Sequence, residues 1–325
     1  GLRQQGFQET DMVAMAKPIT KYAVQIRKPE DIVEELNKAY HIATTGRRGP
    51  VLIDLPMNIQ RSEVENPVYD MTFEDKHTDT DAAQQAADTI LEALEQAKRP
   101  VIMLGHGVDS SFSQQKLIRF AQKRQIPIIT SVLAKSVLGY DHPLNFGCIG
   151  GAYGHRYANM IANAKSDLLL CFGISLCTRQ IGTKVHEFAR GAKIIRIDID
   201  PYNLQRDIHE NGINEVKLQA ETGAVIDCLA KAAAPDTEGI SDWLNVCTEI
   251  KENLQAVDDA TPERYPNRMI ADLSDMLEDT SAIAVDVGQH MVWSYQSFKN
   301  HEGQKLLFSG GHGAMGYGLP AAIGA

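Results

Sequence analysis

The residues best suited to chemistry lie in a glycine-rich run near the end of the chain. Residues 309–319 read Ser-Gly-Gly-His-Gly-Ala-Met-Gly-Tyr-Gly-Leu, with five glycines between Gly310 and Gly318. Glycine has no Cβ and tolerates positive φ, so this run allows the backbone to press against a ligand. An isolated cluster of glycines is more often an ordinary turn, which is the alternative interpretation.

A second candidate site precedes this run, where an apolar segment gives way to Gly288-Gln289-His290. We predict a strand over residues 281–287 and a helix from this turn through Trp293. The turn would place backbone N–H groups and two polar side chains at a helix N-terminus, where N–H groups and the helix dipole attract phosphates. Ligands of parallel sheets also lie beyond the carboxyl ends of the strands. A helix N-terminal turn without a ligand is the alternative.

The rest of the chain alternates short apolar runs with helical patterns, which predicts βαβ units and an α/β fold with doubly wound parallel sheets. Further strands are expected at residues 50–56, 100–104, 126–130, 167–173 and 192–200. Helices are expected at residues 29–45, 82–97, 113–123, 157–164, 222–233, 243–254 and 267–277, and another begins near Ala321. We expect the strand at 50–56 to be buried on both faces, because it is apolar almost throughout.

Two polar stretches without an apolar period divide the chain. Residues 62–81 and 236–262 are interpreted as linkers, the second with a helix of its own. The predicted organisation is therefore a partial domain at residues 1–61, a complete central domain at 82–235 and a second partial domain at 263–325.

Composition restricts the possible partners. The chain has 32 Lys and Arg against 42 Asp and Glu, a net charge of −10, which argues against nucleic acid as a partner. It has no run of the roughly 18 to 20 apolar residues that a membrane helix needs, so no membrane partner is expected. Its five cysteines show no C-x-x-C spacing and are expected to be reduced, mostly buried thiols of a cytoplasmic protein. A metal site is the alternative for these cysteines.

Taken together, the two glycine-containing segments resemble the cofactor domain of thiamine-diphosphate enzymes, specifically acetolactate synthases (acetohydroxyacid synthases), and the resemblance runs over nearly the whole chain. It implies a three-layer α/β fold and the cofactors thiamine diphosphate and Mg²⁺. In that family the turn equivalent to Gly288, Gln289 and His290 contacts the diphosphate. The segment equivalent to Gly313 and Met315 holds the aminopyrimidine ring, and the Met side chain wedges between the two rings.

The resemblance also implies an activity. Acetolactate synthases decarboxylate a 2-oxoacid, pyruvate, on thiamine diphosphate and ligate the acyl unit to a second carbonyl compound, a step of branched-chain amino acid biosynthesis. Another thiamine-diphosphate-dependent decarboxylase or carboligase of a specialised pathway is the alternative. In the family the catalytic Glu and the metal ligands lie outside the stretch that this chain matches. The chain is therefore expected to be an internal fragment that is inactive alone, whose parent is a homodimer or homotetramer.

A flavin site is a further implication of the resemblance. Acetolactate synthases bind a structural FAD, and the family positions for it correspond here to Arg47, Gly105 and Asp198. Two departures argue against flavin binding, because Ser175 stands where the family has its flavin-facing Arg, and Cys177-Thr178 stands where it has an acidic pair. The Gly-x-Gly at Gly105 is also weak support for a dinucleotide, since the third glycine of the fingerprint is missing.

Three residues are candidates for contact with substrate. Phe7 and Gln8 match a Phe-Gln pair near the active-site mouth of the family, and Arg179 retains a positive charge that would bind a 2-oxoacid carboxylate. The family commonly has Lys where this chain has Met57, so the choice of acceptor substrate is expected to differ.

Overall fold

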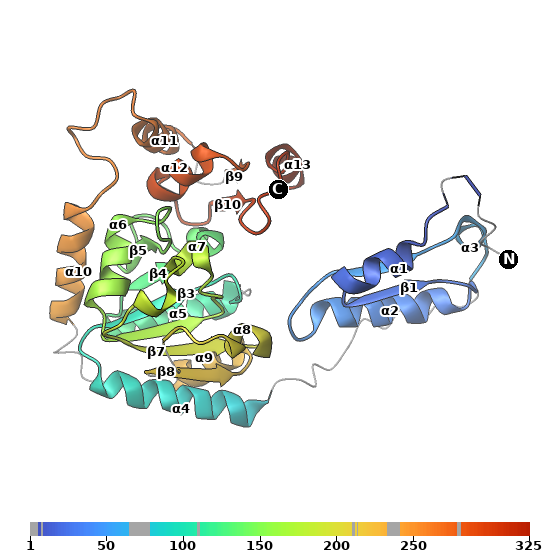
Figure 1. The fold of residues 1–325 in the computed structure, drawn as a ribbon, viewed down its shortest axis with the longest axis horizontal. Coiled ribbons are helices and arrows are strands. Elements are labelled where there is room, and N and C mark those ends of the chain that lie inside the picture. The colour runs from blue at the N-terminus through green and yellow to red at the C-terminus, as the bar shows by residue number, and fades with distance from the viewer. Residues whose placement is uncertain are drawn as a thin grey trace. The chain divides into compact units, whose positions relative to one another are not determined.

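The computed structural model describes residues 6–7, 9–64, 79–108, 111–209, 212, 214–232, 241–277 and 281–325. Gln8 and most of the predicted linker at 62–81 lie outside these residues. The chain divides into two compact units, residues 1–78 and 79–325, which are described separately (Figure 1).

The N-terminal unit is a small βαβ arrangement. Its elements are α1 (Met12–Ala16), a 3₁₀ helix η1 (Lys17–Ile19), β1 (Tyr22–Gln25), α2 (Asp31–Thr44), β2 (Val51–Asp54) and α3 (Met57–Gln60). The strands β1 and β2 pair in parallel, with Tyr22 opposite Val51. The helix predicted at residues 29–45 is present as α2 and the strand predicted at 50–56 is present as β2, but β2 is half-buried. The expectation of burial on both faces was wrong, because in the described part of this unit β2 pairs with β1 alone.

The second unit is built on a six-stranded parallel sheet with the strand order β5-β4-β3-β6-β7-β8. The strands are β3 (Pro100–Leu104), β4 (Ile128–Thr130), β5 (Asn145–Cys148), β6 (Leu168–Phe172), β7 (Lys193–Asp198) and β8 (Glu215–Gln219). From β3 the chain adds β4 and β5 on one side, and it then adds β6, β7 and β8 on the other side. An α/β sheet usually receives a ligand where this change of side occurs, at the carboxyl ends of β3 and β6. The two central strands match the predicted ranges closely, because both are buried throughout.

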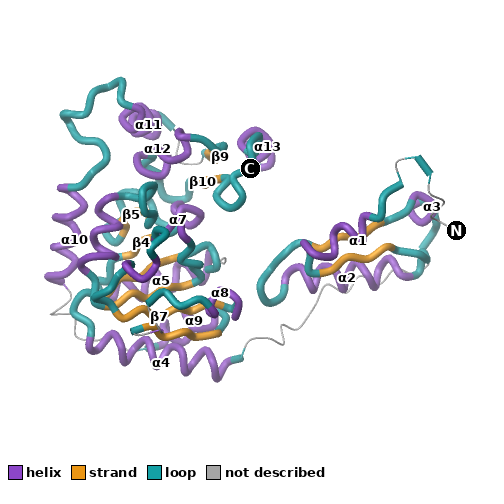
Figure 2. Tube along the Cα trace, viewed as in Figure 1, coloured by secondary structure: helices purple, strands orange, loops and turns teal. Residues whose placement is uncertain are grey.

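Helices cover both faces of this sheet, which confirms the three-layer α/β prediction (Figure 2). One face packs against α4 (Thr80–Gln96), α5 (Ser111–Arg124) and α9 (Thr222–Lys231). The other packs against α6 (Arg156–Asn159), a π-helix η3 (Met160–Lys165) and α10 (Ser241–Asn253). Alternate residues of each strand point to the two cores, so Ile102 lies in one and Met103 in the other. The helix α4 begins at Thr80, inside the stretch predicted to be a linker.

The last part of the chain forms a second, smaller parallel pair. Its elements are α11 (Pro266–Asp275), β9 (Ala282–Val285), α12 (Gln289–Ser297), β10 (Lys305–Phe308) and α13 (Gly318–Gly324). The strands β9 and β10 pair from Ala282 opposite Lys305 to Val285 opposite Phe308. The final helix begins at Gly318, three positions before the predicted start, because its first turn includes the glycine and Pro320.

This part packs on the central sheet through the 3₁₀ helix η2 (Val132–Val137), which follows β4. The Asn300 side chain donates to the Leu138 carbonyl at 2.8 Å, and the Tyr140 N–H donates to the Asn300 carbonyl at 2.7 Å. At the same junction His155 accepts a hydrogen bond from the Cys148 N–H at 2.9 Å, and burial lowers the pKa of His155 well below its usual value. The junction is therefore a bonded interface within the second unit.

Candidate functional site

The carboxyl ends of β9 and β10 bring together the two glycine-containing segments. Because the strands are parallel neighbours, the turn after β9 and the loop after β10 leave the same edge of the sheet. The first segment is Gly288-Gln289-His290 at the start of α12, and the second is the loop at residues 309–317, here called the glycine loop. A Cβ on Gly313 of this loop would lie 3.5 Å from the side chain of Val287, the residue directly before the first segment, so the two segments are neighbours.

The N-terminus of α12 presents polar groups to solvent. Gly288 precedes the helix with φ of 153°, and the side chains of Gln289 and His290 are exposed. Met291 is 1% exposed and anchors the first turn in the core. The first N–H groups of a helix have no intrahelical partners, and the helix dipole makes this end electropositive. This turn therefore offers N–H donors together with one amide and one imidazole side chain.

The glycine loop exposes a methionine side chain to solvent. Gly313 and Gly316 have φ of 69° and 82°, a backbone conformation that favours glycine. Between them, Met315 is 89% exposed. The Ser309 hydroxyl donates to the Ala314 carbonyl at 3.1 Å, which braces the loop just before this methionine. The loop thus presents Met315 to solvent between two glycines of positive φ.

Asp286, which the sequence did not single out, links these segments. Asp286 directly follows the last residue of β9. Its Oδ2 accepts a hydrogen bond from the Gly318 N–H at 2.9 Å, and its Oδ1 accepts one from the Val287 N–H at 2.7 Å. The N–H groups of Gly318 and then Val287 hold the pKa of the Asp286 carboxyl below its usual range. The available signal was its position directly after a strand, at the edge where ligands bind.

Arg179 lies on the central domain close to α12. It belongs to the short helix α7 (Thr178–Ile181), and its guanidinium lies 5.0 Å from the centre of the Tyr153 ring. Burial raises the pKa of Tyr295 in α12 to about 12, and the charge of Arg179 partly opposes this rise. The predicted carboxylate-binding Arg is therefore near the helix that starts at the candidate phosphate site. Of the other substrate candidates, Phe7 is 95% exposed in the N-terminal unit, and Gln8 lies outside the described residues.

The residues predicted to bind FAD are explained by the packing of the central domain. A Cβ on Gly105 would lie 2.0 Å from the Gly173 carbonyl oxygen, and one on Gly107 would lie 2.8 Å from Gly173 Cα. The carboxylate of Asp198 accepts from the Asp200 N–H at 2.9 Å and from the Asn203 side chain at 3.2 Å. These glycines serve a close approach of two loops, and the carboxylate serves the turn into the helix α8 (Pro201–Gln205). Local packing and turn formation therefore account for these family positions in the central domain.

Arg47, the remaining flavin candidate, is an exposed residue of the N-terminal unit. Three cysteines are buried and two are partly exposed, and all five are free thiols, as the sequence predicted. Among the residues that the structure describes, no three His, Cys, Asp or Glu side chains gather in a way that could bind a metal ion. No helix in the described ranges is both long enough and apolar enough to span a membrane.

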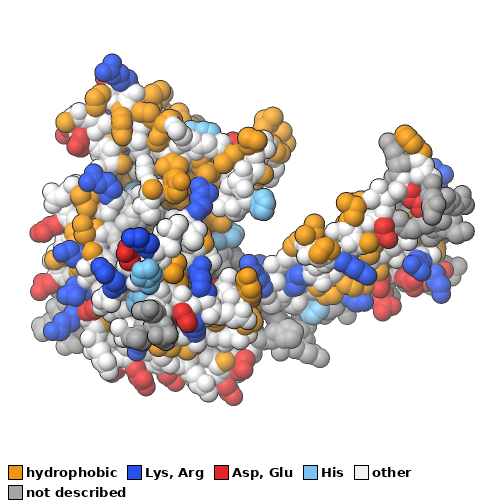
Figure 3. Space-filling view, in the orientation of Figure 1, with side chains coloured by type: hydrophobic (Ala, Val, Ile, Leu, Met, Phe, Trp, Pro, Cys, Tyr) orange, Lys and Arg blue, Asp and Glu red, His pale blue; other side chains and the backbone are white. Residues whose placement is uncertain are grey.

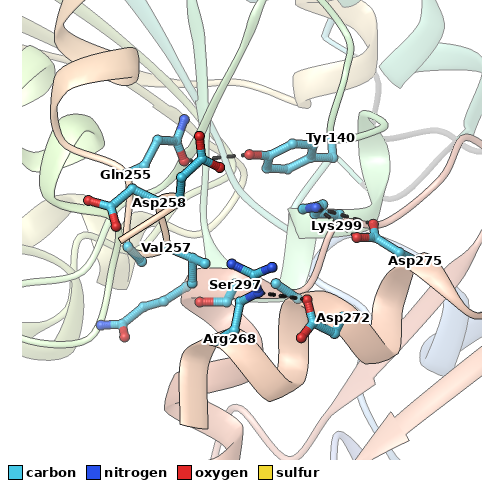
Figure 4. A pocket seen from close by; sticks show the side chains of 13 residues that line it. Tyr140, Gln255, Val257, Asp258, Arg268, Asp272, Asp275, Ser297 and Lys299 are labelled. Atoms are coloured by element: carbon cyan, nitrogen blue, oxygen red, sulfur yellow. Dashed lines mark hydrogen bonds and ion pairs between the residues drawn. The ribbon is translucent and has the colours of Figure 1, made fainter. Parts of the chain in front are cut away.

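A polar cavity of about 210 Å³ lies at the other end of α12, beside the loop at residues 255–259 and the helix α11 (Figure 4). Its wall carries two ion pairs, Arg268 with Asp272 at 2.8 Å and Lys299 with Asp275 at 2.9 Å. The cavity lies where the central domain meets the last part of the chain. Each of these two cations pairs with a carboxylate, so we assign the cavity no ligand.

Comparison with known proteins identifies the family. Residues 87–229 match the family described as thiamine pyrophosphate enzyme, central domain, and residues 286–325 match the thiamine pyrophosphate enzyme C-terminal TPP binding domain. Together the two matches cover more than half of the chain, and the second begins at Asp286. The chain therefore belongs to the thiamine-pyrophosphate enzymes.

Within that family the chain is a homologue of acetolactate synthase large subunits. It is 35% identical to the probable acetolactate synthase large subunit of Methanocaldococcus jannaschii, 31% identical to the large subunit of Lactococcus lactis and 33% identical to that of Corynebacterium glutamicum. Each comparison covers 98% of this chain, but 55%, 54% and 51% of the respective relative. The chain thus spans about half the length of the relatives that it matches.

Proposed function

We propose that the protein is a thiamine-diphosphate-dependent enzyme that decarboxylates a 2-oxoacid, pyruvate, and ligates the acyl unit to a second carbonyl compound. The observation that supports this most directly is the similarity to acetolactate synthase large subunits over 98% of the chain. The region that matches the TPP-binding domain contains both the start of α12 and the glycine loop.

For the cofactor, we propose that the turn at the start of α12 binds the diphosphate of thiamine diphosphate, whose Mg²⁺ would be held by ligands outside this stretch of the protein. The N–H groups of the first turn and the side chains of Gln289 and His290 would contact the phosphate oxygens. Gly313 allows the backbone to approach the aminopyrimidine ring, and Met315 would lie between the two rings and hold them at an angle. When bound, thiamine diphosphate supplies an electron sink for breaking and forming carbon–carbon bonds next to a carbonyl.

For the substrate, we propose that Arg179 binds the carboxylate of the 2-oxoacid. A guanidinium can donate two parallel hydrogen bonds to a carboxylate, and its position over the Tyr153 ring restricts its orientation. Phe7 and Gln8 are proposed to lie near the entrance of the site, on the basis of the family resemblance. FAD is given no role in this proposal, because Ser175 and Cys177 depart from the family's flavin pattern.

A second candidate function is a thiamine-diphosphate-dependent decarboxylase or carboligase of a specialised pathway. Three departures from the acetolactate synthase pattern favour it, namely Ser175, Cys177 and Met57. Met57 is 64% exposed and lacks the charge that the family commonly has at this position. A change of charge near the substrate channel would alter which acceptor is bound.

We also propose that the protein acts as a homodimer or homotetramer in the cytoplasm. The family resemblance supports this assembly. Apolar side chains lie exposed over α13, where Leu319 and Ile323 are 73% and 79% exposed (Figure 3). The free thiols are compatible with a reducing compartment.

The test is incubation of the full-length protein with pyruvate, thiamine diphosphate and Mg²⁺, followed by identification of the products. Acetolactate is the expected product. Acetaldehyde without acetolactate would support the second candidate and refute the first. Release of carbon dioxide that requires no thiamine diphosphate would refute both.

A further inference from the structure

Asp286 occupies the place where the three parts of the candidate site meet. It lies between the end of β9 and the start of α12, and its side chain reaches the first residue of α13, which is 32 positions further along the chain. We propose that Asp286 is a positioning residue that fixes the glycine loop so that Met315 faces the cofactor. This inference rests on the cofactor site proposed above.

The loop is braced on both sides of its methionine. Before it, the Ser309 hydroxyl holds the Ala314 carbonyl at 3.1 Å. After it, Asp286 Oδ2 accepts the Gly318 N–H at 2.9 Å. The two positive-φ glycines beside Met315 are flexible without such contacts, because glycine has more conformational freedom than any other residue.

A carboxylate suits this position better than an amide. Asp286 receives N–H donors from Val287 and Gly318 on different oxygens, and an ionised carboxyl group can only accept hydrogen bonds. An amide would turn its NH₂ group toward one of these donors. The approach is close, since a Cβ on Gly318 would lie 3.2 Å from Asp286 Cβ and 3.2 Å from its backbone nitrogen.

The charge of Asp286 also indicates a specific role. A negative side chain two residues before the start of the predicted diphosphate turn would repel an anionic ligand, so it needs a compensating benefit. The backbone N–H donors of Val287 and Gly318 compensate the charge itself. The benefit of a carboxylate at this position is that it anchors the glycine loop.

The test compares Asp286→Ala and Asp286→Asn with the control Asp275→Asn in the full-length protein. Asp275 is a matched carboxylate that pairs with Lys299 far from the glycine loop, at the other end of α12. Hydrogen exchange of the peptide that contains residues 311–319 reports the loop. Calorimetric titration with thiamine diphosphate and Mg²⁺ reports the cofactor, and the ¹³C-methyl NMR signal of Met315, assigned with Met315→Leu, reports where the methionine lies.

Asp286→Ala should speed exchange in the loop and weaken cofactor binding by about tenfold to a hundredfold, as expected for the loss of charge-assisted hydrogen bonds. Asp286→Asn, which keeps the shape of the side chain and guards against misfolding, should show a smaller effect of the same kind. Asp286→Ala should lose the shift of the Met315 signal that the cofactor causes in the wild type, and Asp286→Asn should reduce this shift. Asp275→Asn should behave as the wild type in all three measurements.

Unchanged loop exchange in both Asp286 variants would overturn the anchoring role. Faster exchange with wild-type cofactor affinity and a wild-type Met315 signal would overturn the positioning role while leaving the proposed function intact. Absence of cofactor binding by the wild type itself would instead refute the proposed function, and this inference with it.

Discussion

Replacing Gly105 by alanine should destabilise the central domain strongly, because the new methyl group has no space. The added Cβ would lie 2.0 Å from the carbonyl oxygen of Gly173 and 2.5 Å from its carbonyl carbon, whereas ordinary contact begins at 3.4 Å. One of the two loops at the ends of β3 and β6 must therefore move by about 1.4 Å, the difference between the first and last of these distances. Backbone atoms cannot give way as a flexible side chain can.

The magnitude follows from what this movement disrupts. Two backbone hydrogen bonds join the loops, from the Gly105 N–H to the Phe172 carbonyl and from the Gly107 N–H to the Gly173 carbonyl, both at 2.9 Å. Overpacking costs about 1–3 kcal/mol, and each hydrogen bond contributes about 0.5–1.5 kcal/mol. We expect the free energy of unfolding of the central domain to fall by about 2–6 kcal/mol.

The assay is urea unfolding followed by the fluorescence of Trp243. This residue is 4% exposed, and its indole N–H donates to the Pro100 carbonyl at 3.0 Å, so it reports the central domain. The experiment uses a Trp293→Phe background, which removes the second tryptophan of the chain. Gly191→Ala is the matched control, because no atom lies within 4 Å of its added Cβ, and its effect should stay within about 1 kcal/mol.

Equal stability of Gly105→Ala and Gly191→Ala would refute the packing explanation of the Gly-x-Gly turn. A separate result would contradict the absence of FAD from the proposed function. If FAD stabilised the wild type against urea, the protein would bind a flavin.

Three further predictions concern the buried groups of the second unit. In the native protein at pH 8, two of the five thiols, those of Cys177 and Cys228, should react quickly with a disulfide reagent, because burial raises the pKa of the other three; a third fast thiol would contradict this. Glu215→Gln should lower the free energy of unfolding by about 3–5 kcal/mol in a urea titration, because it leaves the 2% exposed Arg196 without its carboxylate at 2.7 Å; a loss below about 1 kcal/mol, typical of an exposed pair, would contradict it. His155 has a pKa well below 6.5 when folded, so its unfolded form binds the extra proton, and stability should be lost as pH falls below about 6.5. Urea titrations from pH 7.5 to about 5 should show a steeper loss in the wild type than in His155→Gln, by up to about 1.4 kcal/mol per pH unit, and parallel curves would contradict the buried neutral histidine.

Burial explains which elements could be predicted from the sequence. The strands β3 and β6 lie in the middle of the sheet and are apolar on both faces, so their ranges were predicted almost to the residue. The edge strand β8 was missed, because Glu215, Lys217 and Gln219 alternate with apolar residues in a half-buried strand. The strands β5 and β10 were also missed, since each has four residues and too short an apolar pattern to distinguish it from a loop.

The candidate site divides in the same way. Local sequence was sufficient for Gly288-Gln289-His290 and for the glycine loop, because glycines after a strand and at a helix start are visible signals. Asp286 has one local signal, its position directly after a strand, but its role depends on a hydrogen bond to an N–H that is 32 positions away, which local sequence does not reveal. The interlocked Gly105 and Gly173 were likewise beyond prediction, because their contact joins two loops that only the sheet order makes neighbours.

The most direct test of the cofactor site is calorimetric titration of the full-length protein with thiamine diphosphate in the presence of Mg²⁺, with two methionine variants compared. Met315 and Met269 are both exposed, at 89% and 60%, but only the first lies on the glycine loop. We predict saturable binding by the wild type, at least about tenfold weaker binding by Met315→Ala, and unchanged binding by Met269→Ala. No saturable binding by the wild type, or equal affinities of the two variants, would contradict the assignment of this site.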